Sequence, residues 1–208
     1  MEGDHGTMKV LLINGSAKEK GCTFTALSEV ARGLNESGVE TEILSLGTKP
    51  VADCMGCGKC RETGSCVFGD IVNEIVEKAK TADGFVFGSP VYYAHASGRL
   101  LSVLDRAFYS GGKEFAFKPG AAVVSARRGG TTASLEVINK HFSINQMPIV
   151  TSNYWNMVHG NTPDEVRQDK EGMRTMYNLG RNMAWMIKCI QAGPEHPQNE
   201  KESTNFIR

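Results

Sequence analysis

Short apolar runs separated by polar, glycine-containing segments recur along most of the chain. Five such runs are present, at residues 9–14, 39–46, 84–88, 121–125 and 149–155. Most are compact blocks of Val, Leu, Ile, Phe and Ala, and turn residues follow them, such as Asn14-Gly15-Ser16 after the first and Ser89-Pro90 after the third. Runs of this length and composition predict the buried strands of a parallel sheet.

Helical periodicity fills the segments between these predicted strands. Apolar residues recur at spacings of three and four over residues 24–34, 71–79, 97–108 and 131–142, and residues 163–190 are mostly helical in pattern. Gly38 is placed to end the first helix and Asp70 to cap the second. The alternation predicts the α/β class: a doubly wound, five-stranded parallel sheet between two layers of helices. We expect one domain over residues 1–208, with residues 1–7 as an N-terminal extension and the polar residues 193–208 as a loose tail.

Composition and charge remove several classes of function. The chain has 208 residues, 40% hydrophobic and 22% charged, which is typical of a globular protein. Lys plus Arg equal Asp plus Glu at 23 each, so no net charge favours nucleic acid or a membrane surface. No apolar run is long enough to span a bilayer, and the N-terminus has no signal-peptide pattern. We therefore expect a cytoplasmic protein with neither nucleic-acid nor membrane partners.

The first segment with candidate chemistry is the loop at residues 14–23. In doubly wound folds, ligands bind beyond the carboxyl ends of the strands, near the switch point of the sheet. The loop leads into a helix, whose N-terminus offers N–H groups and a positive dipole end to an anion. It has neither the Walker A nor the G-x-G-x-x-G pattern. It suits one phosphate monoester of a mononucleotide, and the alternative is an ordinary polar loop.

Two further loops follow the third and fourth predicted strands. Tyr92 and Tyr93, after the stiff Pro90, offer aromatic surface to a flat heterocycle, although tyrosines also serve simply in packing. Residues 125–131 contain two glycines that permit close backbone approach and two arginines, Arg127 and Arg128, that either balance negative charge on a ligand or are solvated. All three loops leave the same edge of the predicted sheet, so together they predict one site.

The cysteines form a second motif. Four of the six fall within 13 residues of a glycine-rich segment, as Cys54, Cys57, Cys60 and Cys66. Thiolates at two-residue spacing can surround one soft metal centre, and three plus a more distant fourth is similar to a 4Fe–4S pattern. The last gap is five residues and Val67 replaces the usual proline, so ferredoxin itself is not the template. Zinc, a redox-active thiol pair and free thiols are the alternatives.

The three loops resemble those of the NADPH-dependent FMN reductase branch of the flavodoxin-like superfamily. The matching pieces are the Asn-Gly-Ser…Gly-x-Thr loop of residues 14–23, the Gly-Ser-Pro-Val-Tyr run of residues 88–92 and the Ser-Ala-Arg-Arg-Gly-Gly run of residues 125–130, within a resemblance that covers about residues 9–188. It implies a noncovalent FMN held by Ser16, Lys18, Cys22, Thr23, Phe24, Ser89, Pro90, Val91, Tyr92, Tyr93, Ser125, Arg127, Arg128, Gly129 and Gly130. Family members often carry Asn where Cys22 stands, so only a backbone contact at that position would survive the change.

The cysteine run is similar to that of the iron–sulfur flavoproteins, which implies a 4Fe–4S cluster on the four clustered cysteines. The resemblance as a whole implies an oxidoreductase whose FMN takes electrons from NAD(P)H and passes them to a quinone, a flavin, or a nitro or azo compound. The alternative is an electron carrier in which the cluster relays electrons from a ferredoxin-like protein donor to FMN; a thiol-based redox sensor is a third hypothesis. No acid–base or nucleophilic constellation is present in the sequence, so no catalytic residue is predicted. A homodimer or homotetramer is expected by resemblance.

Overall fold

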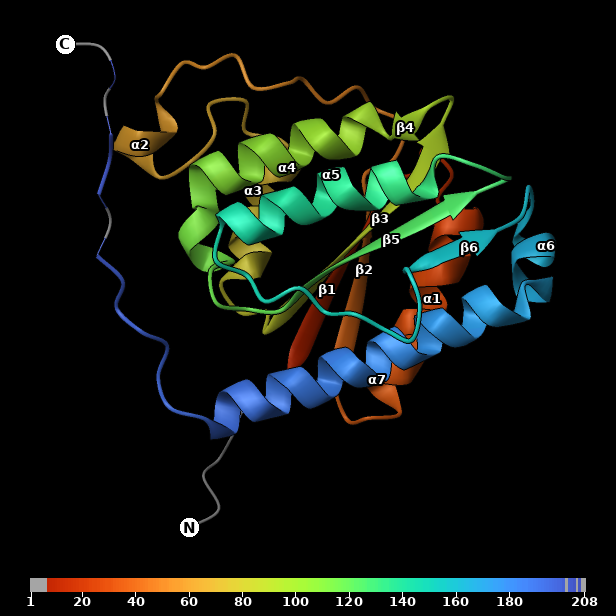
Figure 1. The fold of residues 1–208 in the computed structure, drawn as a ribbon. Helices are drawn as coiled ribbons and strands as arrows, with labels where there is room; N and C mark the ends of the chain where they lie inside the picture. The colour runs from red at the N-terminus through yellow and green to blue at the C-terminus, as the bar shows by residue number, and fades with distance from the viewer. Residues whose placement is uncertain (1–6, 201, 205, 207–208) are drawn as a thin grey trace.

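A parallel sheet runs through the centre of the protein in the computed structural model, which describes residues 7–200, 202–204 and 206 (Figure 1). Neighbouring strands follow the order β2-β1-β3-β5-β6, and each adjacent pair is parallel. A short strand, β4, pairs antiparallel with the end of β3. The strands are β1 (Lys9–Asn14), β2 (Glu40–Ser45), β3 (Gly84–Tyr92), β4 (His95–Ala96), β5 (Gly120–Ala126) and β6 (Met157–His159).

Helices cover both faces of this sheet because its strands are apolar on both sides. On β1, Leu11 and Ile13 face one hydrophobic cluster, whereas Val10 and Leu12 face the other. Helices α3, α4 and α5 pack in the first cluster, and α1, α6 and α7 in the second (Figure 1). The helices are α1 (Cys22–Asn35), α2 (Cys60–Thr63), α3 (Ile71–Ala79), α4 (Gly98–Gly111), α5 (Thr131–Ile144), α6 (Pro163–Gln168) and α7 (Lys170–Ala192), with a 3₁₀ turn at Gly112–Glu114.

The predicted α/β fold, a doubly wound five-stranded parallel sheet in three layers, is confirmed. Strand β1 has β2 on one side and β3 on the other, so the chain reverses its direction of winding between β1 and β3. This switch point is where open α/β sheets leave a crevice at the carboxyl ends of their strands. The topology therefore directs attention to the loops that follow β1, β3 and β5.

The predicted fifth strand at residues 149–155 is wrong in its position. Ile149 makes only an isolated bridge to Gly120, and the fifth parallel strand is β6, further along the chain. The hydroxyl of Ser152 donates to the carbonyl of Tyr154 and to the side chain of Asn156, at 2.8 and 2.7 Å. These local bonds turn the backbone away from the sheet, in competition with a strand ladder.

Strand β3 also differs from its prediction, because it continues through Ser89-Pro90 to Tyr92 instead of stopping. Pairing with β1 ends at Gly88, so Pro90 lies where β3 has lost that neighbour, while its register with Ser125 of β5 is kept. A residue without an N–H donor is tolerated where one side of a strand is unpaired.

The two predicted terminal segments are described only in part. Of the predicted N-terminal extension, residues 1–6 lie outside the described residues. After α7, residues 193–200 form neither helix nor strand and are exposed.

Candidate functional site

Asn14, at the end of β1, holds the first loop in shape. Its buried side-chain amide donates to the carbonyls of Lys18 and Glu19, at 3.4 and 3.1 Å, and its Oδ1 accepts from the N–H of Ser16 at 3.1 Å. The Ser16 hydroxyl in turn accepts from the N–H of Lys18 at 3.1 Å. The loop is therefore wrapped around one asparagine and presents a fixed backbone to the start of α1.

The N-terminus of α1 is suited to an anion. Gly21 occupies the N-cap position and contributes no capping side chain, and the first turn of the helix, which is fully described, carries no acidic residue. The N–H groups of this turn are thus free of the side-chain acceptors that commonly satisfy them. Backbone N–H groups and the helix dipole together favour a phosphate at such a position.

Cys22, the first residue of α1, is a half-buried thiol. Its Sγ lies 3.8 Å from the carbonyl oxygen of Gly160. Burial raises the pKa of the Cys22 thiol above its ordinary value, against the lowering effects of its own backbone N–H and of Lys18. The thiol is therefore protonated at neutral pH, and what this position offers an anion is its backbone.

Direct contacts join the first loop to the end of β3. The N–H of Gly15 donates to the carbonyl of Gly88 at 2.8 Å, and a Cβ at Gly15 would lie 2.7 Å from that same oxygen. The Tyr92 hydroxyl accepts from the N–H of Ala17 at 3.4 Å. Tyr93 is fully exposed and has a φ of 59°, in the left-handed region that non-glycine residues rarely adopt. Two aromatic rings thus stand at the carboxyl end of the central strand.

The third loop meets the other two. Arg127, Arg128 and Gly129 are exposed after β5. Gly130 has a φ of 89°, and a Cβ there would approach the Val91 side chain to 2.8 Å, so only glycine allows this packing.

Thr23 and Ser125 join the start of α1 to the end of β5, because their hydroxyls share a 2.8 Å hydrogen bond that is buried. The three loops therefore form one continuous edge.

The four clustered cysteines lie at a different place. They line one surface pocket together with Phe68 and with side chains from the second half of α4. Cys54 and Cys57 are exposed, whereas Cys60 and Cys66 are half-buried. All six cysteines of the chain are among the described residues and carry free thiols. Within the described ranges, no three His, Cys, Asp or Glu side chains lie close enough together to hold a single metal ion.

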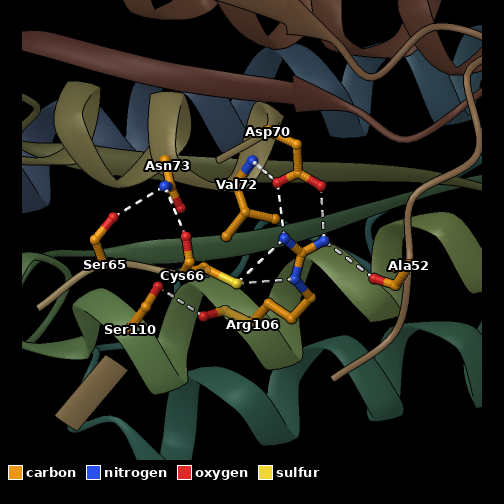
Figure 2. A network of polar contacts seen from close by, with 8 residues as sticks. All are labelled: Ala52, Ser65, Cys66, Asp70, Val72, Asn73, Arg106 and Ser110. Carbon is orange, nitrogen blue, oxygen red and sulfur yellow. Dashed lines mark hydrogen bonds and ion pairs between the residues drawn. The ribbon is translucent and has the colours of Figure 1, made fainter. Parts of the chain in front are cut away.

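The buried Arg106 of α4 also lines this pocket (Figure 2). The guanidinium of Arg106 pairs with both carboxylate oxygens of Asp70, at 2.8 and 2.9 Å, and donates to Cys66 Sγ at 3.2 and 3.3 Å. Burial alone would lower the pKa of Arg106, but the bonds to Asp70 and Cys66 outweigh it and raise that pKa. Burial would likewise raise the pKa of Asp70, but the bonds from Arg106 and from the Val72 N–H lower it.

The loop edge and the cysteine pocket lie at opposite ends of α4. Figure 1 shows β4 near one end of this helix and α2 near the other. Gly98 begins α4 beside the loop edge, and Tyr109 lines the cysteine pocket. Eleven residues of helix separate them, which is about 16 Å at 1.5 Å per residue.

Comparison with known proteins decides the family. The family model for NADPH-dependent FMN reductase matches residues 8–162 of this chain. The chain belongs to the NADPH-dependent FMN reductase family. FMN is therefore its cofactor, NADPH the electron donor that the family name specifies, and the protein is an FMN-dependent oxidoreductase whose partners are electron donors and acceptors.

Relatives and solved structures agree with this family. An iron–sulfur flavoprotein of Methanocaldococcus jannaschii is 35% identical over 192 residues, which cover 88% of this chain and 100% of that protein. RosB with bound 8-demethyl-8-formylriboflavin-5'-phosphate superposes with a TM-score of 0.69 at 12% identity, over 97% of this chain and 93% of that one. An archaeal flavodoxin superposes with a TM-score of 0.60 at 14% identity, over 87% and 99%. At these identities the two structures show the flavodoxin-like fold.

In this FMN reductase family member, the predicted cofactor residues lie along one edge of the sheet. Some of their side chains are hydrogen-bonded within the protein, whereas others are exposed. The Ser89 hydroxyl is buried, accepts from the Ser97 N–H and donates to the Pro90 carbonyl, so it serves the turn between β3 and β4. The Thr23 and Ser125 hydroxyls are likewise engaged with each other. The exposed members of the predicted set are Lys18, Tyr92, Tyr93, Arg127, Arg128, Gly129 and Gly130.

Sequence reasoning missed Asn14 and Arg106. The sequence pattern marks Asn14 only as a turn residue, although an amide at the end of a strand, followed by Gly-Ser, is suited to bonding its own loop. Arg106 lies in a helix whose other residues include Leu100, Leu104 and Phe108; a charge in such a helix is the sequence signal for a buried ion pair.

Within the part of the chain that the structure describes, no helix has both the length and the apolarity to cross a membrane.

Proposed function

We propose that the chain is a single-domain flavoprotein that binds FMN at the three-loop edge and transfers electrons from NAD(P)H to a small acceptor, such as a quinone, another flavin, or a nitro or azo compound. The observation that carries this proposal is the physical continuity of the edge. The first loop bonds to β3 through Gly15 and Ala17, and α1 bonds to β5 through Thr23. A ligand beyond these strand ends would contact all three loops at once.

Each loop has its own part in holding the cofactor. The phosphate would rest on the N–H groups at the start of α1, from Cys22 to Phe24, with Ser16 beside them and the Lys18 ammonium as counter-charge. The flavin ring would lie against Pro90, Val91, Tyr92 and Tyr93, and the arginine loop, with Gly129 and Gly130, would balance negative charge.

The residues of this edge position and shield the cofactor and need supply no acid, base or nucleophile. Bound FMN supplies the chemistry, because it accepts a hydride from NAD(P)H and returns the electrons to an acceptor. The exposed Tyr93, held in a left-handed conformation at the tip of the β3–β4 turn, would limit water access to one side of the ring.

Replacement of Lys18 tests the position of the phosphate. Lys18→Ala should weaken FMN binding by about tenfold, since a hydrogen bond to a charged group contributes about 1.5 kcal/mol. Riboflavin, which lacks the phosphate, should bind equally to both forms. Lys20→Ala, in the same exposed loop, is the matched control and should bind FMN as wild type does. Equal loss of FMN and riboflavin affinity in Lys18→Ala, measured by flavin fluorescence, would argue against this placement.

The cysteine pocket favours a second candidate, an iron–sulfur flavoprotein that relays electrons from a ferredoxin-like protein donor to FMN. Four thiols on one pocket form a donor set that a soft, multi-iron centre accepts, and three glycines with positive φ, Gly56, Gly58 and Gly64, let the loop bend around it. The M. jannaschii relative carries the name of that class. The ligands would be Cys54, Cys57, Cys60 and Cys66.

A serine at Cys60 separates the two candidates. Cys60→Ser should remove most of the iron and acid-labile sulfide from anaerobically purified protein while FMN stays bound. Electron uptake from a reduced ferredoxin should fall, and NADPH oxidation should be unchanged. Cys189→Ser, an exposed thiol on α7, is the control and should keep its iron. Wild-type protein without iron would leave the NAD(P)H-dependent reductase as the function.

We propose further that the protein acts as a homodimer or homotetramer in the cytoplasm. Large exposed side chains support an association surface, with Tyr154 and Trp155 54% and 58% exposed and Trp185 65% exposed. Six free thiols suit a reducing compartment. Light scattering on the eluting FMN-loaded protein tests the assembly, and a single-chain mass at micromolar concentration would contradict it.

A further inference from the structure

Every N–H donor of the Arg106 guanidinium is used, and two of the five point at one sulfur. Nη1 donates to the Ala52 carbonyl at 3.1 Å and to Asp70 Oδ2 at 2.9 Å. Nη2 donates to Asp70 Oδ1 at 2.8 Å and to Cys66 Sγ at 3.2 Å, and Nε donates to the same Sγ at 3.3 Å. Figure 2 shows the Cys66 sulfur on the Nη2–Nε edge of the guanidinium, next to the Nη1–Nη2 edge that faces Asp70.

The arginine is fixed in place by its surroundings. Its side chain is 1% exposed, and the Phe68 ring stacks on its guanidinium with 4.5 Å between the ring centroid and the central carbon. Asp70 is anchored in turn as the N-cap of α3, where its Oδ1 accepts from the Val72 N–H at 3.2 Å. The direction of the two N–H groups toward Cys66 is therefore set by α3 and α4 together.

A neutral thiol is a weak hydrogen-bond acceptor, so two charged N–H donors stabilise it only slightly. A sulfur that carries negative charge, as a metal-bound thiolate does, gains much more from them. Arg106 also lines the pocket that the other three motif cysteines share. The Arg106 guanidinium therefore contacts the pocket at one of its four cysteines, Cys66.

We propose that Arg106 is a positioning residue that holds Cys66 as the fourth cluster ligand and that its two N–H···S bonds raise the reduction potential of the cluster. This inference rests on the iron–sulfur candidate of the proposed function. Reduction of the cluster adds one electron, supplied by a ferredoxin-like donor or by dithionite, and no bond is broken and no proton moves. The added negative charge spreads onto the ligand sulfurs, so donors aimed at Cys66 stabilise the reduced form more than the oxidised form.

A paired substitution isolates these bonds from the charge. Arg106→Met combined with Asp70→Asn removes the N–H donors but leaves the formal charge of the pair at zero, as it is in the wild type, and asparagine keeps the helix cap. Removal of both partners avoids an unpaired buried charge, which is the costly case. Arg106→Lys is the second variant, because it keeps the positive charge and loses the fork. Arg61→Gln, exposed in α2 beside Cys60, is the control for loss of one charge near the motif.

The measurement is a redox titration, followed by electron paramagnetic resonance, of the FMN-loaded full-length protein after anaerobic loading with iron and sulfide. The double variant should be reduced with an equilibrium constant about tenfold lower, a fall in midpoint potential of about 59 mV for a one-electron couple. Arg106→Lys should fall in the same direction by less, and Arg61→Gln should match the wild type. Wild-type potentials in both Arg106 variants would overturn the role of Arg106 and leave the cluster standing. Failure of the wild type to take up iron and sulfide would overturn the cluster, and this inference with it.

Discussion

Single side chains near the two sites act mainly by holding other groups in place. Asn14 bonds three backbone groups of the first loop, Ser89 bonds both sides of the β3–β4 turn, and Asp70 bonds Arg106 while it caps α3. Sequence patterns revealed the capping role of Asp70 because Asp directly before an apolar helical run is a local signal. They could not reveal its ion pair, since Arg106 lies 36 residues away and meets it only through the packing of α3 on α4.

The Asp70–Arg106 pair makes a prediction about acid stability. The pKa of Asp70 is lower in the folded state than in the unfolded state, so its contribution is present above about pH 4 and is lost as the pH falls through the lower folded value. Asp70→Asn should cost about 3 kcal/mol near pH 7, because it leaves Arg106 buried without its counter-charge. The free energy of urea unfolding should then fall less in this variant than in wild type between about pH 5 and about pH 3. Parallel falls in the two proteins would contradict the account.

At the scale of elements, helix and strand periodicity predicted most of the sheet and its covering helices. The predictions failed at Ser152, where local side-chain hydrogen bonds compete with strand pairing. They also failed at Pro90, where β3 continues beyond the end of its pairing with β1. Periodicity also could not show how closely two helices approach. Helices α1 and α7 cross at glycines, where a Cβ on Gly33 would meet the Tyr177 carbonyl and a Cβ on Gly180 would meet the Val30 carbonyl.

This crossing predicts a severe effect of a single methyl group. Gly180→Ala should destabilise the protein by about 2 kcal/mol, because the new atom meets backbone of α1 that cannot rotate away. Gly98→Ala at the first position of α4 is the control, since a Cβ there meets nothing within 4 Å and should leave the stability close to that of the wild type. Urea unfolding of the two variants measures both effects. Equal stabilities would mean that α1 and α7 do not pack as described.

At the scale of the whole molecule, the fold separates two sites along one helix, with the loop edge at the start of α4 and the cysteine pocket near its end. The sequence predicted that the three loops converge, because parallel strands carry their following loops to a common edge. It could not predict which hydroxyls would be used within the protein, as those of Thr23 and Ser125 are, nor that the buried Arg106 of α4 would donate to Cys66 of the cysteine motif. Both depend on contacts between segments distant in sequence.

The most direct test of the account is an absorption spectrum of anaerobically purified protein, recorded before and after addition of FMN, with iron and acid-labile sulfide assayed on the same sample. We expect flavin bands at one FMN per chain, and about four iron atoms per chain if the cysteine pocket holds its cluster. Flavin without iron would leave the NADPH-dependent reductase in place and remove the relay. A folded protein that binds no FMN even after reconstitution would contradict the central claim.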